Sequence, residues 1–134
     1  MVGLLGILVI IMVWTAAGPS KSPSEVVTTF YELANEGKFS QATEYMSSDL
    51  IRNYETSGRN IGLSMAKETR NGAIKDMKII SENINGEIAT VQLQVDWEDG
   101  SPTQTANLNL INEEGEWKLT MKKNYPLKIE TGLF

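Results

Sequence analysis

Residues 88–121 read IATVQLQVDWEDGSPTQTANLNLINEEGEWKLTM, and this stretch decides the fold. Apolar side chains alternate with polar ones in three consecutive runs, which is the period-two pattern of half-buried strands. The alternating apolar residues are Val91, Leu93, Val95 and Trp97, then Ala106, Leu108 and Leu110, then Trp117, Leu119 and Met121. Residues 98–102 and 112–116 are rich in turn formers, so each is predicted to be a hairpin loop. The resulting antiparallel sheet has one apolar face, which helices must cover.

A fourth strand is predicted to precede these three, over residues 73–84. Its alternation is interrupted between Met77 and Ile80, which indicates a bulge or bend near Ile79. Asn85-Gly86 follows, and this dipeptide is typical of a type I′ hairpin turn.

Helices are predicted before the sheet. The sequence Ser22-Pro23-Ser24-Glu25 has the spacing of a capping box with Pro at the first helical position. The apolar stripe that follows and the glycine that ends this helix are Val26, Val27, Phe30, Leu33, Ala34 and Gly37. Apolar spacing predicts further helices over residues 39–46 and 61–70, with a short helical stretch at residues 50–54. Asn71-Gly72 is typical of a left-handed helix stop.

The first 17 residues form an apolar segment that is predicted to be a helix. At 1.5 Å per residue its length is roughly 25 Å, the lower limit for crossing a membrane. Trp14 lies where an interfacial aromatic residue is expected. A signal peptide would begin with basic residues, and no basic residue precedes Lys21. We therefore expect a transmembrane or signal-anchor helix at 1–17, a linker at 18–22 and a folded domain at 23–134.

This apolar segment also leaves alternatives open. Thr15-Ala16-Ala17 fits a small-residue cleavage site, so a secreted monomer with a cleaved leader is one alternative. Gly3 and Gly6 form a small-residue stripe along which a partner helix could pack in the membrane, although lipid also tolerates glycine without a partner.

The composition excludes several classes of function. The net charge of −5 argues against nucleic-acid binding, which needs a concentrated basic face. The absence of Cys and His removes disulfides, thiolate metal sites, a lipoprotein anchor, the usual general base and the serine triad. Asp96, Glu98, Asp99 and Gly100 miss the spacing of a calcium loop, and Asn107 stands where its last Glu is needed. We predict no metal, no cofactor and no nucleic-acid partner.

Charged residues are unevenly distributed along the chain. No Lys or Arg occurs between Lys78 and Lys118, whereas the same stretch carries Glu82, Glu87, Asp96, Glu98, Asp99, Glu113, Glu114 and Glu116. This pattern has two interpretations. One is a solvated sheet edge with polar loops, and the other is an acidic surface that docks a basic partner.

Helices followed by a four-stranded antiparallel meander resemble the cystatin-like cone fold of nuclear transport factor two and its relatives. The opening motifs Ser24-Glu25-Val26-Val27, Phe30-Tyr31 and Gly37-Lys38-Phe39 are similar to those of small bacterial members that are usually exported as lipoproteins. Ile88-Ala89-Thr90-Val91 and residues 114–119 resemble their A-T-V strand and G-x-W-K last strand. The resemblance covers about residues 22–123. It implies an α+β domain in which three helices pack on a curved four-stranded antiparallel sheet.

The resemblance also implies that the sheet and the helices enclose a cone. The side chains expected to line it are Tyr31, Tyr45, Tyr54, Met65, Trp97 and Trp117. Relatives similar to ketosteroid isomerase use an Asp base and a Tyr donor in an apolar pocket. Here Asp96 is out of phase with the apolar residues of its strand, while Asp49 and Asp76 lie at a helix cap and a strand edge. We therefore predict no catalytic residue and expect the aromatic side chains to fill the core.

These features favour a membrane-anchored, non-catalytic domain on the extracytoplasmic side. We expect an accessory subunit or binding module of a larger membrane assembly, with other membrane-protein subunits as partners. The alternative is a small hydrophobic-ligand-binding or isomerase-like enzyme that uses the cone as its pocket. The chain lacks the acylated Cys of the lipoprotein relatives and the His of the enzymes.

Overall fold

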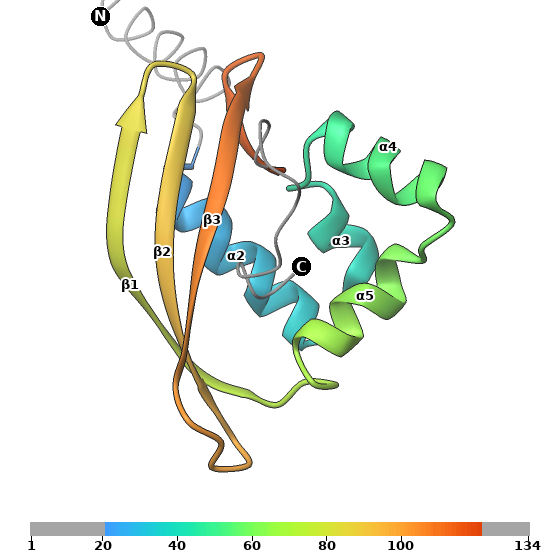
Figure 1. Ribbon diagram of the computed structural model, residues 1–134, viewed down its shortest axis with the longest axis vertical. Coiled ribbons are helices and arrows are strands. Elements are labelled where there is room, and N and C mark those ends of the chain that lie inside the picture. The colour runs from blue at the N-terminus through green and yellow to red at the C-terminus, as the bar shows by residue number, and fades with distance from the viewer. Residues whose placement is uncertain (1–20, 122–134) are drawn as a thin grey trace, which may run out of the picture.

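The computed structural model describes residues 21–121 (Figure 1). The helices are α2 (Pro23–Asn35), α3 (Phe39–Thr43), α4 (Ser48–Ser57) and α5 (Ile61–Glu68). The strands are β1 (Ile74–Asn85), β2 (Ile88–Trp97), β3 (Gln104–Glu113) and β4 (Glu116–Thr120). The described residues thus contain four helices where three were expected, because the short stretch at 50–54 is part of a complete helix, α4, with its own caps.

Two predicted segments lie outside the described residues. They are the apolar helix at 1–17, with Gly3 and Gly6, and the end of the predicted domain, residues 122–134. Within residues 21–121, no helix combines the length and the apolar character needed to cross a membrane.

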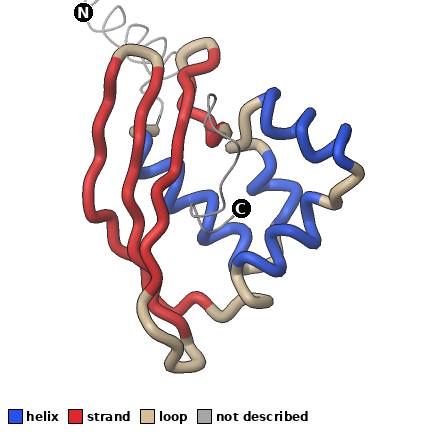
Figure 2. The backbone as a smooth tube through the Cα atoms, viewed as in Figure 1, coloured by secondary structure: helices blue, strands red, loops and turns tan. Residues whose placement is uncertain are grey.

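The four strands form one antiparallel sheet in the order β1-β2-β3-β4. The predicted alternation of β2 and β3 is confirmed, since the apolar residues at alternating positions on one face are buried: Ala89, Val91, Leu93, Val95, Trp97, Ala106, Leu108 and Leu110. On the opposite face the Gln92 amide donates a hydrogen bond to the Asn107 side chain. Figure 2 shows the helices gathered on one side of the bent strand layer. The core therefore lies between the concave face of the sheet and the helices.

The predicted irregularity in β1 is confirmed. The pairing of β1 with β2 shifts register between Ile79 and Ser81, so Ile80 is the extra residue of a β-bulge. A second shift, which the sequence pattern did not indicate, lies between Ile74 and Asp76. Bulges increase the bend and twist of a strand, and β1 curves visibly along its length in Figure 1.

Helix α2 is fastened to β1 at both ends. Beyond the bulge, the Glu82 carboxylate accepts hydrogen bonds from the backbone N–H and the hydroxyl of Ser24, at 2.9 and 2.5 Å. A carboxylate is favourable there because the first turn of a helix has unpaired N–H groups and a positive dipole end. At the other end, the Asn35 amide accepts from the Ile74 N–H and donates to the Ile74 carbonyl.

The predicted capping box of α2 is confirmed. The Ser22 hydroxyl accepts a hydrogen bond from the Glu25 N–H, and the Glu25 carboxylate accepts one from the Ser22 N–H. The predicted apolar stripe is buried apart from Leu33, which is half-buried: Val26, Val27, Phe30 and Ala34 are each at most 2% exposed.

Two other helices end earlier than predicted. Helix α3 ends at Thr43 rather than at Met46, because Met46 forms a parallel bridge to β4. Helix α5 ends at Glu68, because Arg70 and the predicted stop Asn71-Gly72 adopt left-handed φ values of 51°, 59° and 90°. The left-handed stop is therefore confirmed, and it begins one residue early.

The two-residue hairpins differ in backbone conformation. In the β1–β2 hairpin the central residues are Gly86 and Glu87, and only Gly86 has a positive φ, of 67°. The predicted type I′ turn is wrong, since that turn needs two positive φ values, whereas one positive φ at the first position is typical of type II′. In the β3–β4 hairpin both central residues are left-handed, Glu114 at 53° and Gly115 at 90°, as in type I′.

We expect Glu114→Asn to stabilise the domain by about 0.5–1 kcal/mol, because Asn tolerates the left-handed conformation better than Glu and Asn-Gly suits a type I′ turn. Urea denaturation followed by circular dichroism measures the change. The matched control is Glu87→Asn, at a position where φ is not positive, and it should give no gain. An equal gain from both substitutions would show that lost negative charge, and not turn geometry, is the cause.

Candidate functional site

The six side chains predicted to line the cone fall into two groups. Four belong to the core and are each at most 3% exposed: Tyr31, Tyr54, Met65 and Trp97. The other two, Tyr45 and Trp117, are half-buried and line a surface groove. The structure therefore brings together two of the six residues where a ligand has access.

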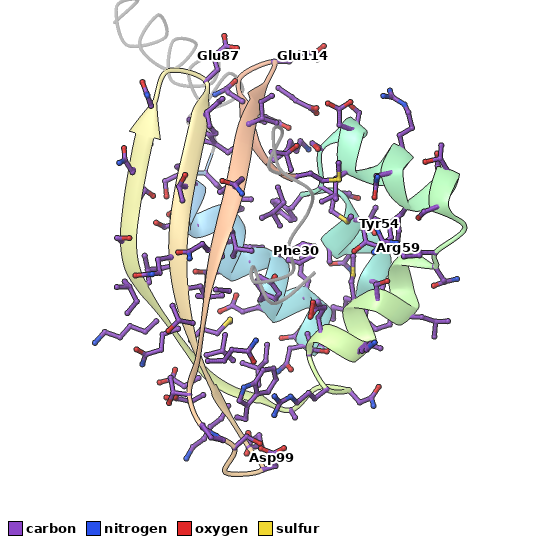
Figure 3. The ribbon with its side chains drawn as sticks, viewed as in Figure 1. Phe30, Tyr54, Arg59, Glu87, Asp99 and Glu114 are labelled. Carbon is purple, nitrogen blue, oxygen red and sulfur yellow. The ribbon has the colours of Figure 1, made fainter. Side chains whose placement is uncertain are left out.

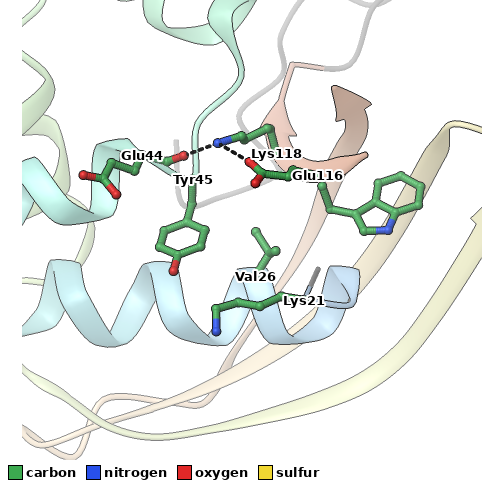
Figure 4. Close-up of a pocket in the computed structure, with 7 residues that line it drawn as sticks. Lys21, Val26, Glu44, Tyr45, Glu116 and Lys118 are labelled. Atoms are coloured by element: carbon green, nitrogen blue, oxygen red, sulfur yellow. Dashed lines mark hydrogen bonds and ion pairs between the residues drawn. The ribbon is translucent and has the colours of Figure 1, made fainter. Parts of the chain in front are cut away.

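The groove has a volume of about 300 Å³ and lies between the start of α2, the end of α3 and β4 (Figure 4). Its lining residues are Lys21, Val26, Glu44, Tyr45, Glu116, Trp117 and Lys118. Apolar and aromatic side chains are thus combined with two ammonium and two carboxylate groups. Such a mixture can hold an apolar group while polar groups fix its orientation.

The backbone next to the groove is held by the edge strand β4. After α3 ends, residues 45–47 run beside β4, where the Leu119 N–H donates to the Tyr45 carbonyl and the Ser47 N–H donates to the Leu119 carbonyl, at 2.8 and 2.7 Å. This pairing covers the edge of β4 at Leu119 only. It also fixes Tyr45 at the wall of the groove.

Lys118 forms a polar wall of the groove. Its ammonium group donates to the Glu44 carbonyl at 2.5 Å and lies 3.4 Å from a Glu116 carboxylate oxygen, as Figure 4 shows. The Glu44 carbonyl belongs to the C-terminal end of α3, where unpaired carbonyls favour a cation. The Lys118 side chain is only 21% exposed, so its charge is largely used within the domain.

A second hollow shares Lys21 with the groove and lies along the first turns of α2. Its volume is about 350 Å³, and it is lined by Lys21, Ser24, Glu25, Thr28, Thr29 and Ile79. Both hollows therefore lie where the chain enters the domain at residue 21.

A half-buried carboxyl group that the sequence analysis missed lies at the edge of the core. Glu68 lies one turn after the buried Met65 on α5, so the i, i+3 spacing placed it on the inner face. Burial raises the pKa of Glu68 from 4.5 to about 8, although the Lys67 ammonium acts in the opposite direction. The pKa of Tyr31 is raised well above its usual value, by burial first and by the Glu68 carboxylate second.

Tyr54 joins this cluster from α4. Burial raises its pKa, while the Arg59 guanidinium and a hydrogen bond with Ser64 act in the opposite direction. The Arg59 guanidinium carbon lies 4.4 Å from the centre of the Tyr54 ring, and Figure 3 shows the two side chains together. A carboxyl group with a raised pKa that lies near two tyrosines has the chemical character of an acid–base cluster.

The opposite end of the sheet holds a stacked pair. The Arg70 guanidinium carbon lies 4.0 Å from the Trp97 ring centre and pairs with Asp99 at 3.6 Å. Hydrogen bonds from Ser101 lower the pKa of Asp99, and Arg70 adds to this effect. The side chain of Asp96 accepts a hydrogen bond from the Thr103 hydroxyl at 2.6 Å, so it serves the hairpin. Across residues 21–121, no cluster of three or more carboxylates could hold a metal ion.

Replacing Glu68 tests its raised pKa. In the unfolded chain this carboxyl ionises near 4.5, so the folded state binds more protons between pH 4.5 and about 8. The free energy of unfolding should therefore fall as the pH rises through this window and level off above it. Glu68→Gln should remove about 1–3 kcal/mol of that fall, measured by urea denaturation from pH 4.5 to 9.

Glu55→Gln, an exposed change on α4, is the control and should leave the slope unchanged. If Glu68→Gln keeps the wild-type pH dependence, the burial of this carboxyl is refuted.

Comparisons with known proteins place the fold. The family described as Domain of unknown function (DUF4878) matches residues 15–120. A Campylobacter jejuni protein, provisionally described as an NTF2-like transpeptidase, is 21% identical, with a TM-score of 0.58 over 76% of this chain and 100% of its own.

Two other solved structures have a similar fold. A SEC-C motif containing protein from Rhodopseudomonas palustris is 12% identical, with a TM-score of 0.57 over 78% of this chain and 80% of its own. A de novo designed NTF2 fold protein is 14% identical, with a TM-score of 0.51 over 77% of this chain and 87% of its own. No curated protein matches the sequence significantly. The chain belongs to the DUF4878 family and has the NTF2-like, or cystatin-like, fold.

Proposed function

We propose that this chain is a membrane-anchored, non-catalytic accessory subunit or binding module of a larger membrane assembly, with its domain on the extracytoplasmic side. The groove beside β4 is its recognition site. The position of the groove at Lys21, within the linker from the predicted anchor, carries this proposal.

The linker length sets the distance between this groove and the membrane. Residues 18–21 can span at most about 14 Å when fully extended. A retained anchor at 1–17 therefore holds the groove close to the membrane surface. This position favours another membrane protein as the partner that contacts Tyr45 and Trp117.

The charge at this end of the domain favours a basic partner. Figure 3 shows Glu87 and Glu114 together at the hairpin end of the sheet. The hairpins also contact each other, because the Asn112 N–H donates to the Glu87 carbonyl at 2.9 Å. These carboxylates belong to the stretch without Lys or Arg between Lys78 and Lys118. Such a one-sided field attracts positively charged surfaces.

The core supports a non-catalytic role. The aromatic rings of Phe30 and Tyr31 pack edge to face with centres 4.9 Å apart, and both are 1% exposed. Without His or Cys, the chain also lacks the side chains that most often transfer protons or attack substrates.

One observation favours the isomerase-like alternative. The raised pKa of Glu68 beside Tyr31 and Tyr54 resembles the acid–base pairing that enolisation chemistry needs. The small ketone 2-cyclohexenone is a suitable probe for this alternative. NMR shifts of the Tyr31 and Tyr54 resonances upon its addition, abolished by Glu68→Gln, would favour the enzyme.

In-cell photo-crosslinking tests the binding module. A photoreactive amino acid at Trp117 should capture one dominant membrane protein. The same residue at Leu63, which is 71% exposed on α5 and outside the groove, is the matched control and should capture none. The intact mass of the detergent-extracted protein should include the first 17 residues. A mature form that begins after Ala17, or equal capture from both positions, would contradict the proposal.

A further inference from the structure

The edge strand β4 presents backbone groups inside the groove that have no partner among residues 21–121. In an antiparallel pair, the N–H and C=O groups of successive residues point alternately toward the partner strand and away from it. Glu113 and Glu116 flank a two-residue hairpin, so they form a hydrogen-bonded pair between β3 and β4. The backbone groups of the next residue, Trp117, must therefore point away from β3.

The pairing of Leu119 confirms this orientation independently. Leu119 is two residues after Trp117, and its N–H and carbonyl bind Tyr45 and Ser47 on the outer side of β4. The backbone groups of Trp117 point in that same direction, toward the groove. Within residues 21–121, no hydrogen bond reaches them from this side.

The shape of the groove suits an extended segment. Residues 45–47 run parallel to β4 beside Leu119, and the groove continues along the same edge beside Trp117. The walls there are the Tyr45 and Val26 side chains, which can cover an apolar residue. An added segment would thus extend the existing pairing of the edge.

The charges around the groove select the chemistry of that segment. The Lys118 ammonium is already engaged by Glu116 and by the Glu44 carbonyl. The groove itself holds the Glu44 and Glu116 carboxylates opposite the Lys21 ammonium, and the hairpin that leads into Glu116 also carries Glu114. A segment with Lys or Arg on either side of an apolar residue fits this field.

The other free edge of the sheet is less suited to pairing. Strand β1 has two register shifts, and bulges of this kind interrupt regular strand addition. Charged side chains also lie along it, at Lys75 and Lys78. The edge of β4, by contrast, opens into a groove lined by Tyr45 and Trp117.

The geometry points to short strand addition: a partner's extended basic segment, with an apolar residue between Lys or Arg residues, pairs its backbone with the N–H and C=O of Trp117. This inference rests on the proposed function and names the form of the partner. Main-chain hydrogen bonds supply the affinity, and the groove selects the apolar side chain.

The test uses the isotope-labelled full-length chain in detergent micelles and the peptide acetyl-Lys-Val-Lys-Val-Lys-amide. Titration should shift the backbone amide resonance of Trp117. The same peptide with all five backbone nitrogens methylated should bind about tenfold more weakly, because it cannot donate to the Trp117 carbonyl. A peptide in which Glu replaces each Lys should also bind more weakly, by at least about fivefold.

Two protein variants separate the backbone from the ring. Trp117→Val keeps the N–H and should weaken binding by about threefold. Trp117→Pro removes the N–H as well and should abolish binding, while the ladder to β3 is kept because proline is tolerated where the N–H points away. Unchanged resonances of Leu93 in the core show that each variant is folded.

Equal affinity for the methylated and unmethylated peptides, or no shift at Trp117, would overturn strand addition. If crosslinking at Trp117 still captured a membrane protein in that case, the proposed function would stand and only the mode of binding would be refuted. If crosslinking failed while the peptide bound as expected, the membrane assembly would be refuted instead.

Discussion

The attachment of α2 across the concave face of the sheet is the constraint on which the rest of this structure depends. Glu82 binds the first turn of α2, and Asn35 at its last turn binds the start of β1. The β-bulge at Ile80 makes this possible, because it reverses the phase of β1 and brings Glu82 to the helix side. Because both ends of α2 are fixed, its apolar stripe packs against β2 and β4.

This arrangement separates the interior from the recognition surface. The interior is packed with large side chains, and the half-buried Glu68 lies at its edge near Tyr31 and Tyr54. The raised pKa of Glu68 makes the stability of the domain depend on pH near neutrality. Without this group, the stability of a chain that has no His would vary little in that pH range. The groove forms outside the core, because α3 ends and no segment within residues 21–121 pairs with the outer side of β4 at Trp117.

Local patterns in the sequence predicted most of the fold. The alternation in residues 88–121, the capping box at Ser22 and the bulge near Ile79 are each short-range signals, and the structure confirms them. The site was less predictable. Tyr45 and Trp117 share a groove only because residues 45–47 pair with β4 over more than 70 positions, a long-range contact that no spacing reveals. Glu68 was overlooked although its spacing from Met65 placed it inward.

Among residues 21–121, the edge of β4 is closed at Leu119 and open at Trp117. Amide hydrogen exchange of the full-length chain, followed residue by residue by NMR, measures this directly, because paired amides exchange only upon opening of the structure. We expect strong protection at Leu119, whose N–H donates to the Tyr45 carbonyl, and rapid exchange at Trp117 two residues earlier. Equal protection of the two amides would show that this edge is already paired and would contradict the account.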